Sequence, residues 1–448
     1  MKWRLWATTL VVALAVACSS SGSGTDTDLT IADAAPDAVT LGDNGQDGAA
    51  MDLAAEEVHR TADIVAETSG AKLCLDIAPS GAFTLLPDAP LTQIHAAVAF
   101  DGQGLWVTYN LPDDDKKFDA WATRLACDGS ILTPPFQLNK LSDANETDPC
   151  ISIKGDIVLT AWQSDNGQAP SNLDIFYRIF TVAGEPVMAT DAALEMLMDG
   201  QPQLGNAWMA QAVPAGQGFE LLGAVALKGA NGFQAAVQPV AADGALPGTD
   251  VTAVAWDPDV SQVYPSAATG PQGQLAVAWT RSAVDESDRV EWAVRPPGSA
   301  DFDAVQDAGV DGASTPALGG NSNGLYLAYT GPMGSKSAPH VRTAESSGEP
   351  LAISAGSSLD HSPAVVPTPS GGLVVWYRNQ GGIKNDVWVQ AFDANEGALE
   401  KDGLATKMND GFAAAYPAAV AHIEGESVVV VWSEGTSPDF VMKGRFSK

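Results

Sequence analysis

The chain has 448 residues, of which 45% are hydrophobic, and this is enough for one large core or several domains. It carries 23 basic and 55 acidic residues, a formal net charge of −32. That balance argues against nucleic acid and against adsorption to anionic lipid headgroups, because both need clustered Lys and Arg. It favours solubility and a basic or cationic partner.

The first 17 residues have the features of a signal peptide. Lys2 and Arg4 precede the apolar stretch Ala7–Ala17, which is too short to cross a bilayer. The sequence Leu14-Ala15-Val16-Ala17-Cys18 resembles the lipobox of bacterial lipoproteins, although Ala15 stands where the lipobox usually has Leu. A plain secretory signal followed by an unrelated cysteine is the alternative.

The lipobox resemblance implies cleavage before Cys18, lipidation of its thiol and attachment to a membrane of the cell envelope. Ser19 follows the cysteine, whereas an Asp there retains many enterobacterial lipoproteins at the inner membrane. The resemblance therefore implies the outer membrane, with the side of that membrane left open.

Residues 18–71 are expected to form a disordered acidic tether. The segment starts with a run of Ser and Gly, and from Thr25 to Gly70 it holds eleven acidic residues, one basic residue and no aromatic residue. A segment with so little hydrophobicity and so much like charge cannot offset the entropy cost of ordering.

Residues 72–448 contain a repeat with a period near 50 residues. Each unit opens on a proline and a short apolar strand, and a Gly-containing turn leads to a stronger strand that ends in an aromatic residue. The prolines lie 47 to 63 residues apart, at Pro149, Pro202, Pro265, Pro316, Pro363 and Pro417. A period of this length indicates repeated supersecondary units.

Seven units of four strands predict an all-β fold, a seven-bladed β-propeller of four-stranded antiparallel blades. The first unit lacks the proline and has His95 in its place, and the third, around Phe219–Val225, lacks the aromatic residue. Because the chain ends on a third strand, we expect Ala82–Leu86 to supply the outer strand of the seventh blade.

Three cysteines follow Cys18, namely Cys74, Cys127 and Cys150. An exported compartment permits one disulfide among them and leaves one thiol free, and the sequence does not choose the pair. The repeat as a whole resembles the uncharacterised β-propeller lipoproteins of environmental bacteria. That resemblance rests on the Pro, Gly and Trp spacing and implies architecture without implying an activity.

The sequence contains no metal-binding motif of histidines and no sialidase motif. Its five histidines have no metal-ligand spacing, and the Ser-x-Asp-x-Gly-x-x-x-Trp boxes of sialidases are missing. The abundant acids keep open a glycan-active hydrolase or lyase with carboxylates near the propeller axis. A purely structural envelope component is a further alternative.

Acidic residues gather in loops expected on one face of the ring, where they would focus negative potential. We therefore expect a ligand- or protein-binding module that uses this acidic loop face, with a protein, a glycan or a divalent cation as the ligand. The candidate ligand-binding residues are Asp113, Asp114, Asp115, Trp256, Asp257 and Asp259. No cofactor is predicted, and Ca²⁺ held by clustered Asp is the alternative, although no Asp-x-Asp-x-Asp-Gly loop occurs.

Overall fold

A computed structural model describes residues 74–447 except 88–91, 114–116, 141–143, 166–172, 195–196, 199–200, 203–206, 228, 247–250, 346–347, 356–358, 381–384, 396–397, 411–417 and 437–438. The predicted signal peptide, Cys18, the tether, Asp114, Asp115 and Pro417 lie outside the described residues. No helix in the described part of the chain is long and apolar enough to span a membrane.

Seven four-stranded antiparallel sheets form a propeller ring, which confirms the predicted fold. Blade 1 contains β2 (Ile94–Phe100), β3 (Leu105–Pro112), β4 (Phe118–Leu125) and β5 (Ile131–Gln137). Blade 2 contains β6 (Glu146–Lys154), β7 (Ile157–Ser164), β8 (Asp174–Thr181) and β9 (Ala192–Ala193). Blade 3 contains β12 (Ala207–Ala215), β13 (Gly218–Val225), β14 (Gln234–Val240) and β15 (Thr252–Ala253). Blade 4 contains β16 (Ser261–Thr269), β17 (Leu275–Ser282), β18 (Arg289–Arg295) and β19 (Gln306–Asp307).

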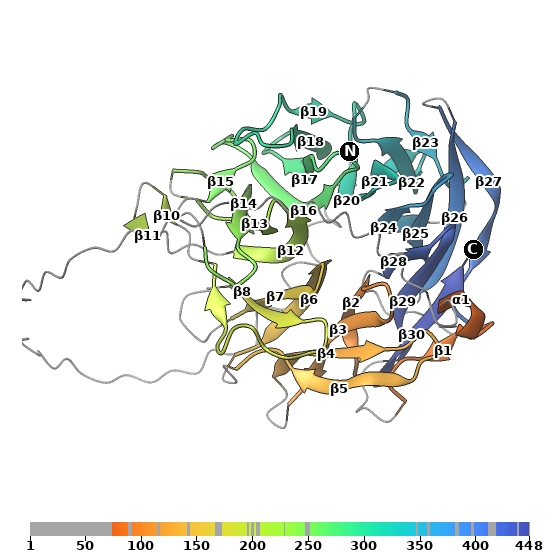
Figure 1. Ribbon diagram of the computed structural model, residues 1–448. Coiled ribbons are helices and arrows are strands. Elements are labelled where there is room, and N and C mark those ends of the chain that lie inside the picture. Colours follow the sequence, from red (N-terminus) through yellow and green to blue (C-terminus); the bar gives the residue numbers. More distant parts are fainter. Residues whose placement is uncertain are drawn as a thin grey trace, which may run out of the picture. The chain divides into compact units, whose positions relative to one another are not determined.

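Blade 5 contains β20 (Ser314–Asn321), β21 (Gly324–Met333), β22 (Lys336–Thr343) and β23 (Leu351–Ala352). Blade 6 contains β24 (Leu359–Pro367), β25 (Gly371–Asn379), β26 (Asn385–Asn395) and β27 (Ala398–Lys407). Blade 7 contains β28 (Ala419–Glu424), β29 (Ser427–Thr436), β30 (Asp439–Ser447) and β1 (Phe83–Thr84). The first strand of each blade lies nearest the middle of the ring and the fourth lies at the rim (Figure 1).

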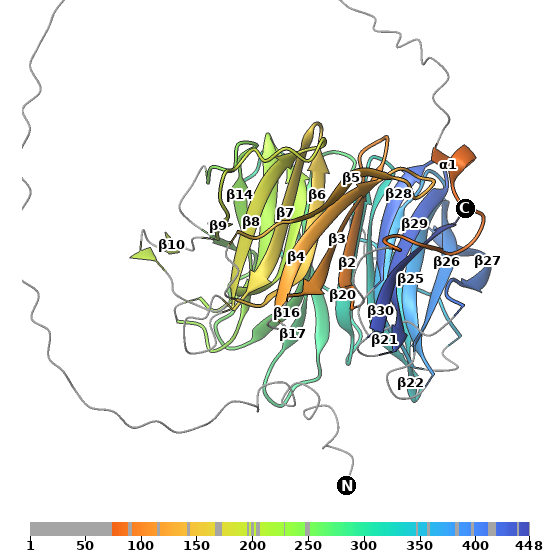
Figure 2. The same cartoon turned by 90° about the horizontal axis from the view of Figure 1, so that it is seen from below.

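The second strands form the buried centre of each blade. All eight residues of β13 are buried, and so are the first seven of β3, because both faces of these strands pack on neighbouring blades. The aromatic residues near their ends, such as Trp279 and Trp432, are fully buried between blades, as the repeat pattern predicts. Figure 2 shows the strands of the blades standing side by side in edge view.

Blade 7 is closed by the N-terminal strand. Phe83 and Thr84 of β1 pair with Gly444 and Lys443 of β30, and the Leu85 amide donates to the Met442 carbonyl at 3.0 Å. Figure 1 shows β1 beside β30 at the meeting point of the two ends of the ring. The predicted role of Ala82–Leu86 is therefore confirmed.

One disulfide ties this closing segment to blade 1. Cys74, in the short helix α1 (Cys74–Ile77), is bonded to Cys127, which follows β4. Cys150 is the free cysteine among the described residues, and burial raises the pKa of its thiol to about 12. The pairing that the sequence left open thus links the chain's first propeller segment to its first complete blade.

The structure corrects the predicted repeat at two positions. Pro202 does not open blade 3, because it belongs to β11 (Gln201–Pro202), which pairs with β10 (Leu197–Met198) in a separate hairpin. In the first strand of blade 3, Ala210 occupies the position that the repeat proline takes in other blades. In blade 1, Ala96 takes that position, and His95 corresponds to the residue before the proline. Blade 3 therefore has neither the proline nor the aromatic residue of the repeat.

Candidate functional site

A β-bulge interrupts the first strand of blades 1 to 6 at the same place. In blade 2, Thr147 pairs with Gln163 and Cys150 with Ala161, so Asp148 and Pro149 together oppose Trp162. The same two-against-one arrangement recurs in the other five blades, and a bulge of this kind re-aims the side chain it carries. We call the first residue of each pair a bulge residue; the six are His95, Asp148, Met209, Tyr264, Thr315 and Ser362.

All six bulge residues have a left-handed backbone, with φ between 49° and 58°. Eight non-glycine residues among those described have positive φ, and six of them are the bulge residues. The left-handed conformation costs an L-residue about 1–2 kcal/mol, and four of these residues also precede proline, which favours φ near −120°. Glycine would avoid that cost, yet the chain carries six different side chains here.

Side chains of the neighbouring blade hold the bulges in place. The backbone amide of Met209 donates to Gln163 Oε1 at 2.8 Å, and the amide of Thr315 donates to Thr280 Oγ1 at 3.1 Å. Both acceptors lie on the second strand of the preceding blade. In blades 3 and 5 the strained conformations are thus fixed by contacts between blades, which is the condition under which such strain persists.

The six bulge residues line one cavity of about 470 Å³, built by the first strands around the ring axis. Its remaining described walls are Gln211 and a set of small or cyclic apolar residues, namely Ala210, Pro265, Pro316, Ala317, Pro363, Ala364 and Ala418. The volume lies in the range of small-molecule sites, and a mainly apolar wall with a few polar groups is their usual composition.

Most polar groups of the axial cavity fall on two arcs. On blades 1 and 2, His95 Nδ1 forms an ion pair with Asp148, whose second oxygen accepts a hydrogen bond from Gln163 Nε2. On blades 4 to 6, Tyr264, Thr315 and Ser362 contribute hydroxyl groups, and the Tyr264 residue is 41% exposed. Between the two arcs, blade 3 contributes the apolar thioether of Met209 and the amide of Gln211, whose Oε1 accepts the Ala267 amide at 3.0 Å.

The charge of the cavity wall is simple. Asp148 is the one carboxylate, and no Lys or Arg occurs among the described residues that line it. The paired carboxylates of glycoside hydrolysis are therefore absent from the described wall. Asp148 was not among the candidate residues predicted from the sequence, and its place at the axis comes from the bulge.

A second acid lies buried beside this wall. Glu146, two residues before Asp148, is 1% exposed, and Ser164 Oγ donates to its Oε1 at 3.0 Å. Burial raises the pKa of Glu146 to about 8, the hydrogen bond from Ser164 opposes that rise, and the charges of Asp191 and Asp119 add to it. Near neutral pH the protonated form of this carboxyl is thus strongly populated.

The residues predicted from the sequence are placed elsewhere. The loop between β15 and β16 holds Trp256, Asp257 and Asp259, and Trp256 is 47% exposed there. Asp113 follows β3 in blade 1, and its side chain caps its own turn by accepting the Lys117 amide at 2.8 Å. None of these four residues lines the axial cavity. The structure joins three of them in one loop and leaves Asp113 three blades away.

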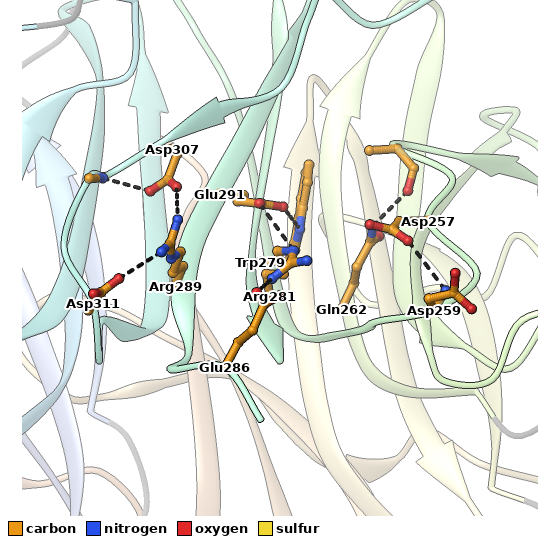
Figure 3. Close-up of polar contacts among 12 residues, drawn as sticks. Asp257, Asp259, Gln262, Trp279, Arg281, Glu286, Arg289, Glu291, Asp307 and Asp311 are labelled. Carbon is orange, nitrogen blue, oxygen red and sulfur yellow. Dashed lines mark hydrogen bonds and ion pairs between the residues drawn. The ribbon is translucent and has the colours of Figure 1, made fainter. Parts of the chain in front are cut away.

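On blade 4, basic side chains neutralise part of the acidic loop face. Arg281 pairs with Glu286 at 2.5 Å and with Glu291 at 3.6 Å (Figure 3). In the same view Arg289 pairs with Asp307 at 3.4 Å and with Asp311 at 3.0 Å. The Asp257 side chain accepts a hydrogen bond from the Asp259 amide at 3.3 Å. This reduces the negative field that an unpaired acidic face would present.

Within the described residues, no group of three His, Cys, Asp or Glu side chains is arranged to hold a metal ion. Asp114 and Asp115, which belong to the Ca²⁺ alternative, lie outside those residues. The alternative therefore rests on the sequence alone.

The sequence did contain a signal for the axial site. Four bulge residues directly precede a repeat proline, as in Asp148-Pro149 and Tyr264-Pro265. The proline is the feature that recurs, and the residue before it changes from unit to unit. A varied residue beside a constant proline is the pattern that could have located the cavity.

No family model and no curated protein matches this chain. Among solved structures, a protein of unknown function from Dyadobacter fermentans is 12% identical with a TM-score of 0.49, over 82% of this chain and 97% of the other. A Trypanosoma rangeli sialidase in complex with the inhibitor DANA is 8% identical with a TM-score of 0.42, over 79% of this chain and 54% of the sialidase. A Penicillium chrysogenum α-L-arabinanase complexed with arabinobiose is 14% identical with a TM-score of 0.43, over 66% and 92%. These likenesses concern the propeller fold alone.

Proposed function

We propose that this protein is a ligand-binding module of the cell envelope whose site is the axial cavity. The observation that carries the proposal is the ring of six strained, non-glycine bulge residues that line one cavity of about 470 Å³. Strain maintained by the surrounding structure and directed at a cavity is a mark of functional sites. A bulge that only served the fold could carry glycine at every one of these positions.

The ligand is a small neutral or cationic molecule. The described wall offers one carboxylate, which is paired with His95, and no Lys or Arg, and the chain's net charge of −32 disfavours the approach of an anion. Hydroxyl groups from three successive blades and the half-exposed ring of Tyr264 provide hydrogen bonds and a stacking surface. The acidic loop face then acts by attracting cations toward the ring, and its residues make no contact with the bound molecule.

Two sets of substitutions distinguish the cavity from the loop face. The cavity variant is Asp148→Asn with Tyr264→Ala, and the face variant neutralises Asp113, Asp114, Asp115, Asp257 and Asp259 together. We expect choline or a neutral disaccharide such as cellobiose to raise the melting temperature of the parent and of the face variant, and to leave the cavity variant unchanged. Citrate serves as the anionic control and should have no effect.

Calorimetric titration of the same molecules checks the result. Binding that survives the cavity substitutions and is lost in the face variant would move the site to the acidic loops. A face variant that also loses a Ca²⁺-dependent rise in melting temperature would establish the cation alternative there. The absence of any response to neutral or cationic molecules would contradict the cavity proposal.

The envelope location rests on the lipobox resemblance and is tested separately. We expect Cys18→Ser to release the protein from membranes or to block its processing, because the hydrophobic stretch before Cys18 is too short to anchor it. Fractionation and mass measurement of the mature N-terminus check this. Unchanged membrane association of the variant would contradict lipid anchoring, and the matched substitution Ser19→Ala should have no effect.

A further inference from the structure

Blade 6 carries a series of polar contacts that ends in the axial cavity. Ser362 Oγ lies 3.1 Å from His361 Nδ1, and His361 Nε2 lies 3.3 Å from Asn385 Oδ1. Ser362 is the bulge residue of β24, with φ of 50°, and it lines the cavity. A serine, a histidine and an amide in this order have the connectivity of a nucleophile, a base and the group that orients the base.

The hydrogen bonds define which nitrogen of His361 is free to act as a base. Asn379 Nδ2 donates to Asn385 Oδ1 at 3.3 Å, which fixes that oxygen as the acceptor facing His361 Nε2. Nε2 therefore carries the proton, and Nδ1 is left to accept the Ser362 hydroxyl proton. Burial lowers the pKa of His361, opposed by the bond to Asn385 and the nearby charge of Asp360, so the imidazole is neutral at neutral pH.

This Ser-His-Asn arrangement is not repeated at the matching positions of blades 1 to 5. The residues at the position of His361 in those blades are Ile94, Thr147, Trp208, Val263 and Ser314, none of which titrates near neutral pH. Structural features of a repeat recur from blade to blade. A half-buried imidazole that appears in one blade, beside the hydroxyl of a bulge residue that lines the cavity, has no counterpart in that structural pattern.

We propose that Ser362 is a nucleophile for acyl transfer and that the axial cavity hydrolyses small neutral or cationic esters. The inference goes beyond ligand binding but rests on the same cavity. Ser362 Oγ attacks the ester carbonyl carbon while His361 Nδ1 takes the hydroxyl proton, and the carbonyl electron pair moves onto oxygen. The tetrahedral intermediate collapses, and the alcohol leaves with the proton from His361.

A water molecule completes the turnover. It loses a proton to His361 Nδ1 and attacks the acyl-Ser362 carbonyl, which releases the acid and returns the proton to Ser362 Oγ. The hydroxyls of Thr315 and Tyr264, on the two preceding blades, line the same wall and can donate to the oxyanion. Asn385 is a positioning residue that keeps His361 in its reactive tautomer.

The first test is covalent labelling of the full chain with a fluorophosphonate. We expect one adduct, on Ser362, in the parent protein. Ser370→Ala is the matched control: Ser370 lies in the turn between β24 and β25 of blade 6, its hydroxyl donates to Glu426 Oε2 at 2.9 Å, and it does not line the axial cavity. Labelling should persist in Ser370→Ala and vanish in Ser362→Ala and in His361→Gln.

The second test is hydrolysis of p-nitrophenyl acetate by the parent and the same variants. We expect kcat/KM to fall at least about 100-fold in Ser362→Ala and His361→Gln, the range for loss of a nucleophile or its base. Circular dichroism and melting temperature establish that the variants are folded. Ser362→Cys, which retains a nucleophile, should still be labelled by iodoacetamide at residue 362.

A folded parent that takes no label on Ser362, or whose esterase activity equals that of Ser362→Ala, would overturn the proposal and leave the contact as local packing of blade 6. Choline or cellobiose binding, measured on the parent, is independent of this chemistry, because neither molecule is an ester. Binding without labelling would refute the acyl-transfer step alone, whereas loss of binding in every variant and in the parent would refute the cavity site itself.

Discussion

Removal of residues 72–90 should open the propeller and abolish cooperative folding at ordinary temperatures. The segment supplies β1, the outer strand of blade 7, and the buried side chains of Leu85 and Leu86. Burial of two leucines contributes about 3–6 kcal/mol, and loss of the Cys74–Cys127 disulfide costs about 2–5 kcal/mol more. Together these losses approach the whole stability of a typical domain, about 5–15 kcal/mol.

Two further variants should have smaller effects on the melting temperature. Removal of residues 19–70 should leave the melting temperature unchanged, because the tether is expected to bury nothing. Cys74→Ser should have an intermediate effect, since it keeps β1 paired with β30 but no longer ties it to blade 1. Thermal unfolding with and without reductant measures all three. Equal melting temperatures for the 72–90 and 19–70 deletions would show that ring closure does not depend on β1.

The sequence predicted the ring because the features that build it are repeated and local. Each second strand needs a run of Val, Leu and Ala, since it is buried on both faces, and most end in an aromatic residue such as Trp162 or Trp376 that fills the space between blades. The closing strand was predictable for the same reason. A ring that ends on the third strand β30 leaves an edge, and the pattern of Ala82–Leu86 matched the missing fourth strand.

The structure also explains why the proline and the aromatic residue recur together. They stand on opposite sides of one bulge, so that Pro149 and its bulge residue face Trp162, and Pro363 and its bulge residue face Trp376. In blade 3 the aromatic position is Gly223, and even a Cβ there would clash with Ile175 Cδ1. The neighbouring blade thus fills the space that the aromatic residue takes in the other units.

The candidate site was harder to predict because its residues share a backbone angle and no chemistry. His95, Met209 and Ser362 have nothing in common as side chains, and only the positive φ at the bulge brings them to one cavity. The sequence showed instead where acidic residues are frequent, but their frequency does not show which of them form ion pairs. The charges of Glu286 and Asp311 are offset by arginines that come from other parts of blade 4.

The buried Glu146 should make stability fall as the pH rises. The pKa of its carboxyl is about 8 in the folded protein and near 4.5 in the unfolded chain. Between these values the folded state holds a proton that the unfolded state has lost, so the contribution is complete below pH 4.5 and is lost as the pH rises toward 8. The difference makes the folded state less stable above pH 8 than below pH 4.5 by an amount on the order of 3–5 kcal/mol.

Glu146→Gln should remove this dependence, because the neutral amide keeps the size of the protonated acid and can still accept the Ser164 hydroxyl proton. We expect the variant to match the parent near pH 4.5 and to melt at a higher temperature at pH 8.5. Glu220→Gln is the matched control: Glu220 is also buried, but it is ion-paired with Arg295, so its neutralisation should destabilise the protein at both pH values. If the parent and Glu146→Gln lose stability equally between pH 5 and 8.5, the carboxyl of Glu146 is charged in the fold, and another group must account for the pH dependence.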